Sequence, residues 1–487
     1  MTDAPPPSPA DRWENPLGTR YASTEMSALF SARSKFTTWR RLWLWLAEAE
    51  KDLGLPIPDA ALVQLRQHLV PSDAELASAD RYERDTKHDF MAHLHALGEV
   101  APAAKGVLHL GATSAFVGDN ADLVQLREAL RLLARRTVRV MAKLTRFARR
   151  YRDLPCLGFT HFQAAQPTTI GKRACLWLQD LALDHRELTR RADELRFLGC
   201  KGATGTQASF VALFDGDAEK ADRLDKIVAE KAGFPGRLLV SGQTYTRKQD
   251  AMVLAALAGL AASASKFAND LRLLQHLKEV EEPFGNKQVG SSAMPYKRNP
   301  MKAERMNALA RWLLIASENA NWTHATQWFE RTLDDSANRR LALAECFLSA
   351  DGILLLWDAV AEGLVVHESV VRRRLEQELP FLATENILMA AVRKGGDRQV
   401  LHEKIRLLSQ AAGDRLKNEG GPNDLLARIG ADSAFRLTPA EIAVASDPDR
   451  FIGRAPEQVD EFLSVEIDPI LATDPEAARA AAEEVRV

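Results

Sequence analysis

The segment from residue 290 to residue 305 holds the side chains best suited to catalysis. Two hydroxyls, Ser291 and Ser292, follow Gly290, and a proline-bounded turn then carries the cation Lys297. A serine oxygen can accept a proton when nearby cations or backbone N–H groups stabilise its alkoxide. The segment therefore predicts a site that removes a proton from a carbon beside a carboxylate, with one of the serines as the base. A flexible surface loop is the alternative, which the agreement of the whole segment disfavours.

A helix is expected to begin directly after this turn, near Pro300. The positive end of its dipole would stabilise a charged serine oxygen. Glu304 and Arg305 fall in its first turn. We expect both side chains to belong to the same site.

A single histidine, His161, stands in the break between two long helical patterns. Its neighbours Thr160, Gln163 and Gln166 are polar. An imidazole can pass a proton to a leaving nitrogen near neutral pH. A lone histidine in a turn is usually structural, but the polar neighbours favour a catalytic role here.

Three histidines fall between residues 87 and 95. On a helix, His88 and His93 lie on different faces and His93 nearly opposes His95, so the His-x-x-x-His spacing of a helical zinc site is absent. We therefore expect no metal, and packing roles for His93 and His95. His88 together with Asp89 at a helix start suits substrate contact.

Arginine and hydroxyl side chains near residue 335 suit an anion. Ser336 and Arg340 are four positions apart, on one face of a helix. With Arg331 they form a plausible anion clamp, because arginine matches phosphate geometry. A surface ion pair between Arg331 and Asp335 is the alternative.

Three other short segments give weaker signals. Thr113 and Ser114 precede the first long helix and offer hydroxyl and N–H groups to a carboxylate. Arg20 and Tyr21 add a cation and a hydroxyl near the N-terminus, and Gln243 lies in a further polar turn.

The composition is that of a soluble protein with a large core. The chain has 487 residues, 46% of them hydrophobic, and a net charge of −2, which argues against a general nucleic-acid binder. The four cysteines show no Cys-x-x-Cys spacing and are expected to be buried thiols of a reducing compartment. The proline-rich N-terminus has no signal pattern, and no uninterrupted apolar run is long enough for a membrane helix. We therefore expect a soluble, cytoplasmic protein.

Long helices must position the candidate residues. Apolar residues recur at spacings of three and four in five long segments, and many small residues would let these helices approach closely. The expected starts are near Asp119, after Pro167, and near Ala251, Met301 and Ala337.

The predicted fold is all-α and divides into three domains. These are an N-terminal helical domain over 1–112, a central bundle of long helices over 113–365, and a domain of shorter helices over 366–487. Any β structure should be a minor hairpin near residues 237–246. Apolar faces that a single bundle would leave exposed predict oligomerisation.

Four sequence blocks together resemble the fumarase/aspartase superfamily, whose members eliminate fumarate from succinyl compounds. The blocks are GSSAMPYKRNPM, LGFTHFQ, HLGATS and QWFERTLDDSANRR. The resemblance covers nearly the whole chain and is closest to the animal-type branch that acts on succinylated purine nucleotides. It implies two substrates, adenylosuccinate (giving AMP) and SAICAR (giving AICAR), with fumarate leaving in both cases. It also implies no cofactor, and a homotetramer with a 20-helix core in which three subunits build each active site.

The resemblance also assigns roles by position. Ser291 would be the base that takes the Cβ proton, with Ser292 as its nearest rival, and His161 the acid that protonates the departing nitrogen. Lys297 would stabilise the aci-carboxylate intermediate, Glu304 would hold the local charge network, and His88 would join the catalytic group. The nucleotide, chiefly its phosphate, would be held by Arg20, Tyr21, Arg331, Ser336 and Arg340, and the rest of the substrate by Lys87, His88, Asp89, Thr113, Ser114, Thr160, Gln243, Ser292 and Arg305.

One departure from the pattern and two other functions stay open. An arginine is expected where Lys87 stands, and lysine keeps the charge but loses the bidentate fork. Another fumarate-releasing lyase, such as an argininosuccinate lyase, would leave Arg331 and Arg340 without a phosphate. A crystallin-like homologue without activity is disfavoured by the presence of Ser291 and His161.

Overall fold

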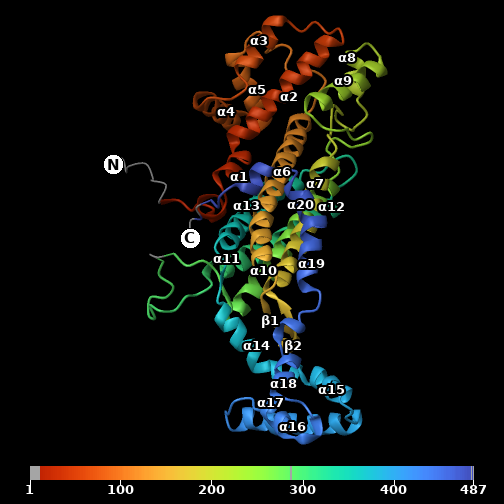
Figure 1. Cartoon of the computed structure of the whole chain (residues 1–487). Helices are drawn as coiled ribbons and strands as arrows, with labels where there is room; N and C mark the ends of the chain where they lie inside the picture. Colours follow the sequence, from red (N-terminus) through yellow and green to blue (C-terminus); the bar gives the residue numbers. More distant parts are fainter. Residues whose placement is uncertain (1–10, 286–287, 484, 486–487) are drawn as a thin grey trace, which may run out of the picture.

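The computed structural model describes residues 11–285, 288–483 and 485, and it shows an elongated, mostly helical molecule (Figure 1). Helices from the first hundred residues lie at one end, long helices run through the middle, and shorter helices lie at the opposite end. The mostly helical fold predicted from the sequence is confirmed.

Five long helices form the central bundle, close to their predicted positions. They are α6 (Ser114–Arg150), α7 (Ile170–Glu194), α10 (Lys248–His276), α11 (Met301–Ala316) and α13 (Asp335–Glu362). α6 packs along α7 and α13, while α10 packs along α7, α11 and α13. α6 begins slightly before the predicted start at Asp119, because Ala115, Phe116 and Val117 are already buried in the core.

α10 lies at the centre of this core. By length and composition alone it could cross a membrane. Its Leu257, Leu260 and Phe267 side chains are nevertheless fully buried by the neighbouring helices, and Phe267 stacks on Trp357 of α13 at a centroid distance of 4.9 Å. This burial is the pattern of a core helix in a helical bundle.

Other apolar side chains on the same long helices face outward. Leu176 and Leu183 of α7, Leu273 of α10, and Trp312 and Ile315 of α11 are all exposed. Contiguous exposed apolar surface is typical of protein–protein contact sites. The oligomerisation predicted from the sequence would cover these side chains, and it stays a prediction.

The N-terminal end is a group of short and medium helices. They are η2 (Leu17–Tyr21), α1 (Thr24–Leu29), α2 (Ala32–Asp52), α3 (Asp59–Gln67), α4 (Asp73–Thr86) and α5 (Asp89–Val100). Two more helices, α8 (Ala208–Leu213) and α9 (Ala218–Lys231), lie beside them (Figure 1). α2 packs on α6 and α9, so this group shares its hydrophobic core with the bundle.

The C-terminal helices divide into two parts. One part has a core of its own around Leu401, Leu425 and Phe435. The other part returns along the central bundle, where α19 packs on α7 and α21 packs on α6. The helices of the first part are α14 (Glu368–Leu382), α15 (Thr384–Arg393), α16 (Arg398–Asn418), α17 (Leu425–Ala431), η3 (Ser433–Phe435), α18 (Pro439–Ala445) and η4 (Pro448–Arg450), and those of the second are α19 (Ala455–Phe462), η5 (Leu463–Ile467), α20 (Asp468–Leu471) and α21 (Pro475–Arg479). The three-domain division at residues 112 and 365 stays a prediction.

Two small antiparallel pairs make up the β structure of the described residues. β1 (Pro155–Thr160) pairs with β2 (Gln163–Thr169), and β3 (Val280–Glu281) pairs with β4 (Val365–Val366). The hairpin predicted near residues 237–246 was wrong. That segment is irregular, because its polar groups bond to other elements: Tyr245 N donates to the Asp119 carboxylate, and Arg237 forms only an isolated bridge with Phe197.

Candidate active site

A cavity of about 690 Å³ opens where the N-terminal helices meet the ends of α6 and α13. This volume suits a small-molecule ligand. Eight of the side chains predicted for the site line the cavity: Lys87, His88, Asp89, Ser114, Gln243, Arg331, Ser336 and Arg340. They come from five separate parts of the sequence, so the fold gathers them at one place.

The turn between α4 and α5 supplies three of these residues. Lys87 caps the C-terminus of α4 in a left-handed conformation, with φ 55°. This turns the chain so that His88 becomes the N-cap of α5 and Asp89 its first residue. The predicted helix start at His88 and Asp89 is confirmed. His93 is buried and stacks on Phe36 at 3.5 Å, which confirms its packing role.

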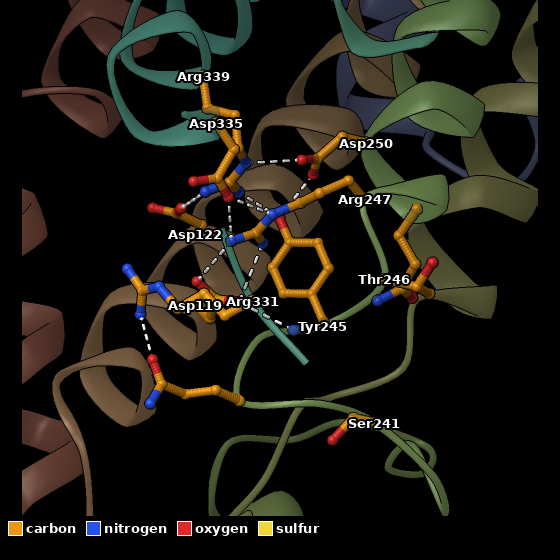
Figure 2. A network of polar contacts seen from close by, with 12 residues as sticks. Asp119, Asp122, Ser241, Tyr245, Thr246, Arg247, Asp250, Arg331, Asp335 and Arg339 are labelled. Atoms are coloured by element: carbon orange, nitrogen blue, oxygen red, sulfur yellow. Dashed lines mark hydrogen bonds and ion pairs between the residues drawn. The ribbon is translucent and has the colours of Figure 1, made fainter. Parts of the chain in front are cut away.

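An ionic network in the wall of the cavity fixes the start of α13 (Figure 2). Arg247 donates to Asp119 of α6 at 2.9 Å and to Asp335 of α13 at 2.7 Å. Arg339 pairs with Asp250 of α10 at 2.7 Å and with Asp122 of α6 at 2.9 Å. The network therefore ties three long helices together at the cavity, and Asp119, Asp122, Arg247, Asp335 and Arg339 are among the residues that line it.

The phenol of Tyr245 lies at the centre of this network. Its hydroxyl accepts from Arg339 and donates to Asp250. Burial raises the pKa of Tyr245 well above its usual value, although Arg339 opposes the shift. The phenol therefore stays neutral and serves as a hydrogen-bond relay between the arginine and the carboxylate.

The anion clamp predicted near residue 335 is assembled at the cavity. Ser336 and Arg340 both line it, and Arg340 pairs with Asp89 at 3.0 Å. Arg331 donates to the Gln243 side chain at 2.7 Å, while Asp335 is taken up by the buried network. The alternative of an Arg331–Asp335 ion pair is therefore wrong.

Gln243 reaches Arg331 because two backbone segments touch. A Cβ atom on Gly242 would lie 2.3 Å from the carbonyl oxygen of Glu330, so only glycine allows this approach. The N–H of Gln243 donates to the same carbonyl at 3.0 Å. Thr113 is the N-cap of α6 beside the cavity, and its side chain makes no capping hydrogen bond.

His161 occupies the tip of the β1–β2 hairpin. His161 and Phe162 form a two-residue turn in which both have positive φ, 53° and 56°, as a type I′ turn requires. The side chains of Thr160 and His161 are exposed there. Arg173 of α7 supports the hairpin from below by donating to the Leu157 carbonyl at 2.7 Å.

The serine segment forms a loop between β3 and α11. The Ser291 hydroxyl accepts the Met294 N–H at 3.1 Å, and Asn299 donates to the Gly290 carbonyl at 2.7 Å. A Cβ atom on Gly290 would lie 2.2 Å from the Lys297 carbonyl, so this glycine lets the loop close on itself. Ser292 and Lys297 are exposed in the same loop.

The N-terminus of α11 is not available to stabilise a serine alkoxide. The buried carboxylate of Glu282 accepts the N–H groups of Lys302 and Ala303 at 3.0 and 2.9 Å. The predicted help from this helix dipole was therefore wrong, because a carboxylate already occupies it. Glu304 is exposed in the first turn, and Arg305 keeps a buried Nη1 atom without a partner among the described residues.

Arg20 and Tyr21 lie in a third place. They form the end of η2, and Tyr21 packs against Gly352 of α13. Gly352 is sixteen residues beyond Ser336, about 24 Å along the helix. One chain alone therefore does not bring Arg20 and Tyr21 to the cavity.

The lengths of the helices separate the catalytic candidates from the cavity. α6 spans 37 residues, about 55 Å, with Ser114 at the cavity end and the His161 hairpin after the other end. α10 spans 29 residues, about 43 Å, and leads from the buried network to the Ser291 loop. In one chain the predicted site is thus divided among the cavity, the hairpin, the serine loop and η2.

Several residues at the cavity were missed by the sequence analysis. Arg339 lies beside Arg340 in α13, so the pair of adjacent arginines in the sequence could have indicated it. Lys35 and Trp39 also line the cavity, but they belong to an ordinary amphipathic pattern in α2. The missed residues are Lys35, Trp39, Asp119, Asp122, Arg247 and Arg339.

The chain is similar to known lyases over nearly its full length. A family model described as lyase matches residues 25–313, and one described as adenylosuccinate lyase C-terminus matches residues 380–462. An adenylosuccinate lyase from Saccharomyces cerevisiae is 51% identical over 95% of this chain and 96% of its own length. An adenylosuccinate lyase from Schizosaccharomyces pombe is 50% identical over 94% of this chain and 96% of its own length.

A solved structure supports the fold. The 3-carboxy-cis,cis-muconate lactonizing enzyme from Pseudomonas putida matches with a TM-score of 0.79 and 24% identity, covering 92% of this chain and 98% of that one. At 24% identity, this similarity supports the fold and carries no statement about activity.

Proposed function

The chain belongs to the adenylosuccinate lyase family, and we propose on this basis that it is a carbon–nitrogen lyase of purine biosynthesis. It cleaves adenylosuccinate into AMP and fumarate, and SAICAR into AICAR and fumarate. The observation that carries the proposal is the cavity, where Arg331, Ser336 and Arg340 gather from separate turns beside His88 and Ser114. Such a set suits a nucleotide that carries a phosphate at one end.

The reaction needs one base and one acid on opposite sides of a carbon–carbon bond. Ser291 takes the proton from Cβ of the succinyl group, and the electron pair passes into the neighbouring carboxylate to give an aci-carboxylate. Lys297 stabilises the charge of this intermediate. The electrons then return to form the double bond of fumarate while the carbon–nitrogen bond breaks, and His161 gives a proton to the departing nitrogen.

The remaining predicted residues bind and orient. Arg20, Tyr21, Arg331, Ser336 and Arg340 hold the nucleotide, chiefly its phosphate. Glu304 holds the charge network of the serine loop, and His88 contributes to catalysis from the cavity. The other parts of the substrate contact Lys87, Asp89, Thr113, Ser114, Thr160, Gln243, Ser292 and Arg305.

The complete site forms in a homotetramer in the cytoplasm. Two features support this: helices tens of ångströms long separate the parts of the site in one chain, and apolar side chains on α7, α10 and α11 are exposed. Packing the long helices of four copies together would cover these side chains. It would also carry the Ser291 loop and the His161 hairpin of neighbouring subunits to each cavity.

The direct test is turnover of adenylosuccinate by the purified full chain without added metal. Release of equal amounts of AMP and fumarate is expected. Assembled protein that releases neither contradicts the proposal. Competition by AMP and by arginine then separates this activity from that of an argininosuccinate lyase, because only AMP should bind the phosphate clamp.

A further inference from the structure

Among the cations that line the cavity is Lys35, which no motif in the sequence assigns to the site. Lys35 lies in the first turn of α2, where Ser31 is the N-cap, and its side chain lines the cavity. Six lysine and arginine side chains line the cavity: Lys35, Lys87, Arg247, Arg331, Arg339 and Arg340.

Three of these six cations form ion pairs with carboxylates. The ion pairs are Arg247 with Asp119 and Asp335, Arg339 with Asp122 and Asp250, and Arg340 with Asp89. Within the described part of the chain, Lys35, Lys87 and Arg331 form no ion pair. Of these three, Lys87 and Arg331 already belong to the proposed site, which leaves Lys35 without an explanation.

Aromatic rings hold the Lys35 ammonium in place. Its Nζ atom lies 5.0 Å from the centre of the Trp39 ring and 5.6 Å from that of Phe36. A cation over an aromatic face keeps its N–H groups free to donate. The half-buried ammonium is therefore positioned, but no hydrogen bond joins its N–H groups to another described residue.

The charges around Lys35 define what it can bind. Asp122, Asp89 and Glu83 favour its charged form, Arg340 opposes it, and burial lowers its pKa. Lys35 and Arg340 thus face the same space and repel each other. A dianion between them would relieve this repulsion and accept hydrogen bonds from both.

We infer that Lys35 is a further binding residue for the phosphate group of the nucleotide substrate. The inference rests on the proposed function, because Arg340 and Ser336 are the phosphate clamp of that proposal. Lys35 would add to the clamp from α2, whereas Ser336 and Arg340 come from α13. It would act as a point charge with three donors, whereas the arginines supply planar forks.

The test compares phosphorylated and unphosphorylated ligands on full-length Lys35→Met. We expect the Kd for AMP to rise about 10- to 100-fold, since a hydrogen bond to a charged group is lost. The Kd for adenosine should not change. KM for adenylosuccinate should rise with kcat within about twofold, because the contact is made equally before and during the reaction. Inhibition by inorganic phosphate should weaken in parallel.

Two variants serve as controls. Lys35→Arg keeps the charge and should retain most of the AMP affinity. Lys417→Met removes an exposed lysine from α16, in the C-terminal helices, and should change no ligand affinity.

Four outcomes would overturn the inference. They are unchanged AMP affinity, an equal loss for AMP and adenosine, a loss confined to fumarate or succinate (which would assign Lys35 to the succinyl carboxylates), and a lowered melting temperature that explains the loss. The activity of the wild-type protein shows whether the role of Lys35 or the proposed function has failed. A wild type that cleaves adenylosuccinate, beside an unimpaired Lys35→Met, would reject only the role of Lys35.

Discussion

Arg339 and Arg340 are adjacent in the sequence, but they face different sides of α13. The Arg339 guanidinium is buried and pairs with Asp250 and Asp122, whereas 64% of the Arg340 side chain is exposed and its partner is Asp89 at the cavity. Consecutive residues of a helix point about 100° apart. One arginine therefore fixes the helix, and its neighbour is left free to meet a ligand.

This relationship predicts different effects for the two alanine variants. Arg339→Ala leaves two carboxylates without their buried partner and should cost about 3–5 kcal/mol of stability. Arg340→Ala should cost less than about 1 kcal/mol, because exposed ion pairs contribute little. It should instead raise the Kd for AMP at least tenfold. Urea unfolding and AMP titration measure the two effects, and a stability loss confined to Arg340→Ala would contradict the assignment.

The two serines of the loop give the second prediction. Ser291→Ala should lower kcat by several orders of magnitude with little change in AMP affinity, because the base acts only in the chemical step. Ser292→Ala, its matched control in the same loop, should raise KM and leave kcat within about tenfold. If Ser292→Ala is the variant that loses turnover, the base role passes to Ser292.

Much of the fold could be predicted from the sequence, because long helices leave a clear apolar period. The hairpin that carries His161 could not. Its turn residues, His161 and Phe162, are not the asparagine and glycine usually found in a type I′ turn. Pro167, after which the sequence predicts a helix, lies buried inside β2, and α7 begins at Ile170.

The site was partly predictable for a similar reason. Ser336 and Arg340 share a helix face, and their spacing alone brings them together. Lys35 and Arg247 reach the same cavity from positions that are far apart in the sequence, and only the packing of α2 and the segment before α10 places them there. No local pattern carries that information.

The third prediction concerns stability against pH and a buried acid on α2. Glu50 is fully buried, neither of its carboxylate oxygens has a partner among the described residues, and burial raises its pKa to about 9. The folded chain therefore keeps a proton that the unfolded chain loses above pH 4.5. Stability should fall as pH rises from there towards 9, by at most about 1.4 kcal/mol per pH unit.

Glu50→Gln should remove this slope and raise the unfolding free energy at pH 8. Glu48, two residues earlier, is the control. Burial would raise its pKa, but its ion pairs with Lys231 and Arg66 outweigh burial, so the pKa of Glu48 is lowered. The contribution of Glu48 to the free energy of unfolding is fully present above the pKa of Glu48 in the unfolded chain, and it is lost only in acid. Glu48→Gln should therefore lower stability slightly at pH 8 and leave the slope between pH 6 and 9 intact. Identical slopes in wild type and Glu50→Gln would show that Glu50 is ionised in the folded state.

The last prediction tests whether base and acid come from different subunits. In the proposed homotetramer, the Ser291→Ala chain and the His161→Gln chain should each be inactive when present alone. The two chains are then co-expressed with different tags and purified as mixed assemblies. Roughly a quarter of the sites should receive an intact Ser291 from the His161→Gln chain and an intact His161 from the Ser291→Ala chain. About a quarter of the wild-type activity should return. Co-expression of two differently tagged Ser291→Ala chains controls for contamination. If one subunit supplied both residues to a site, every site in the mixture would lack one of them, and no activity would return.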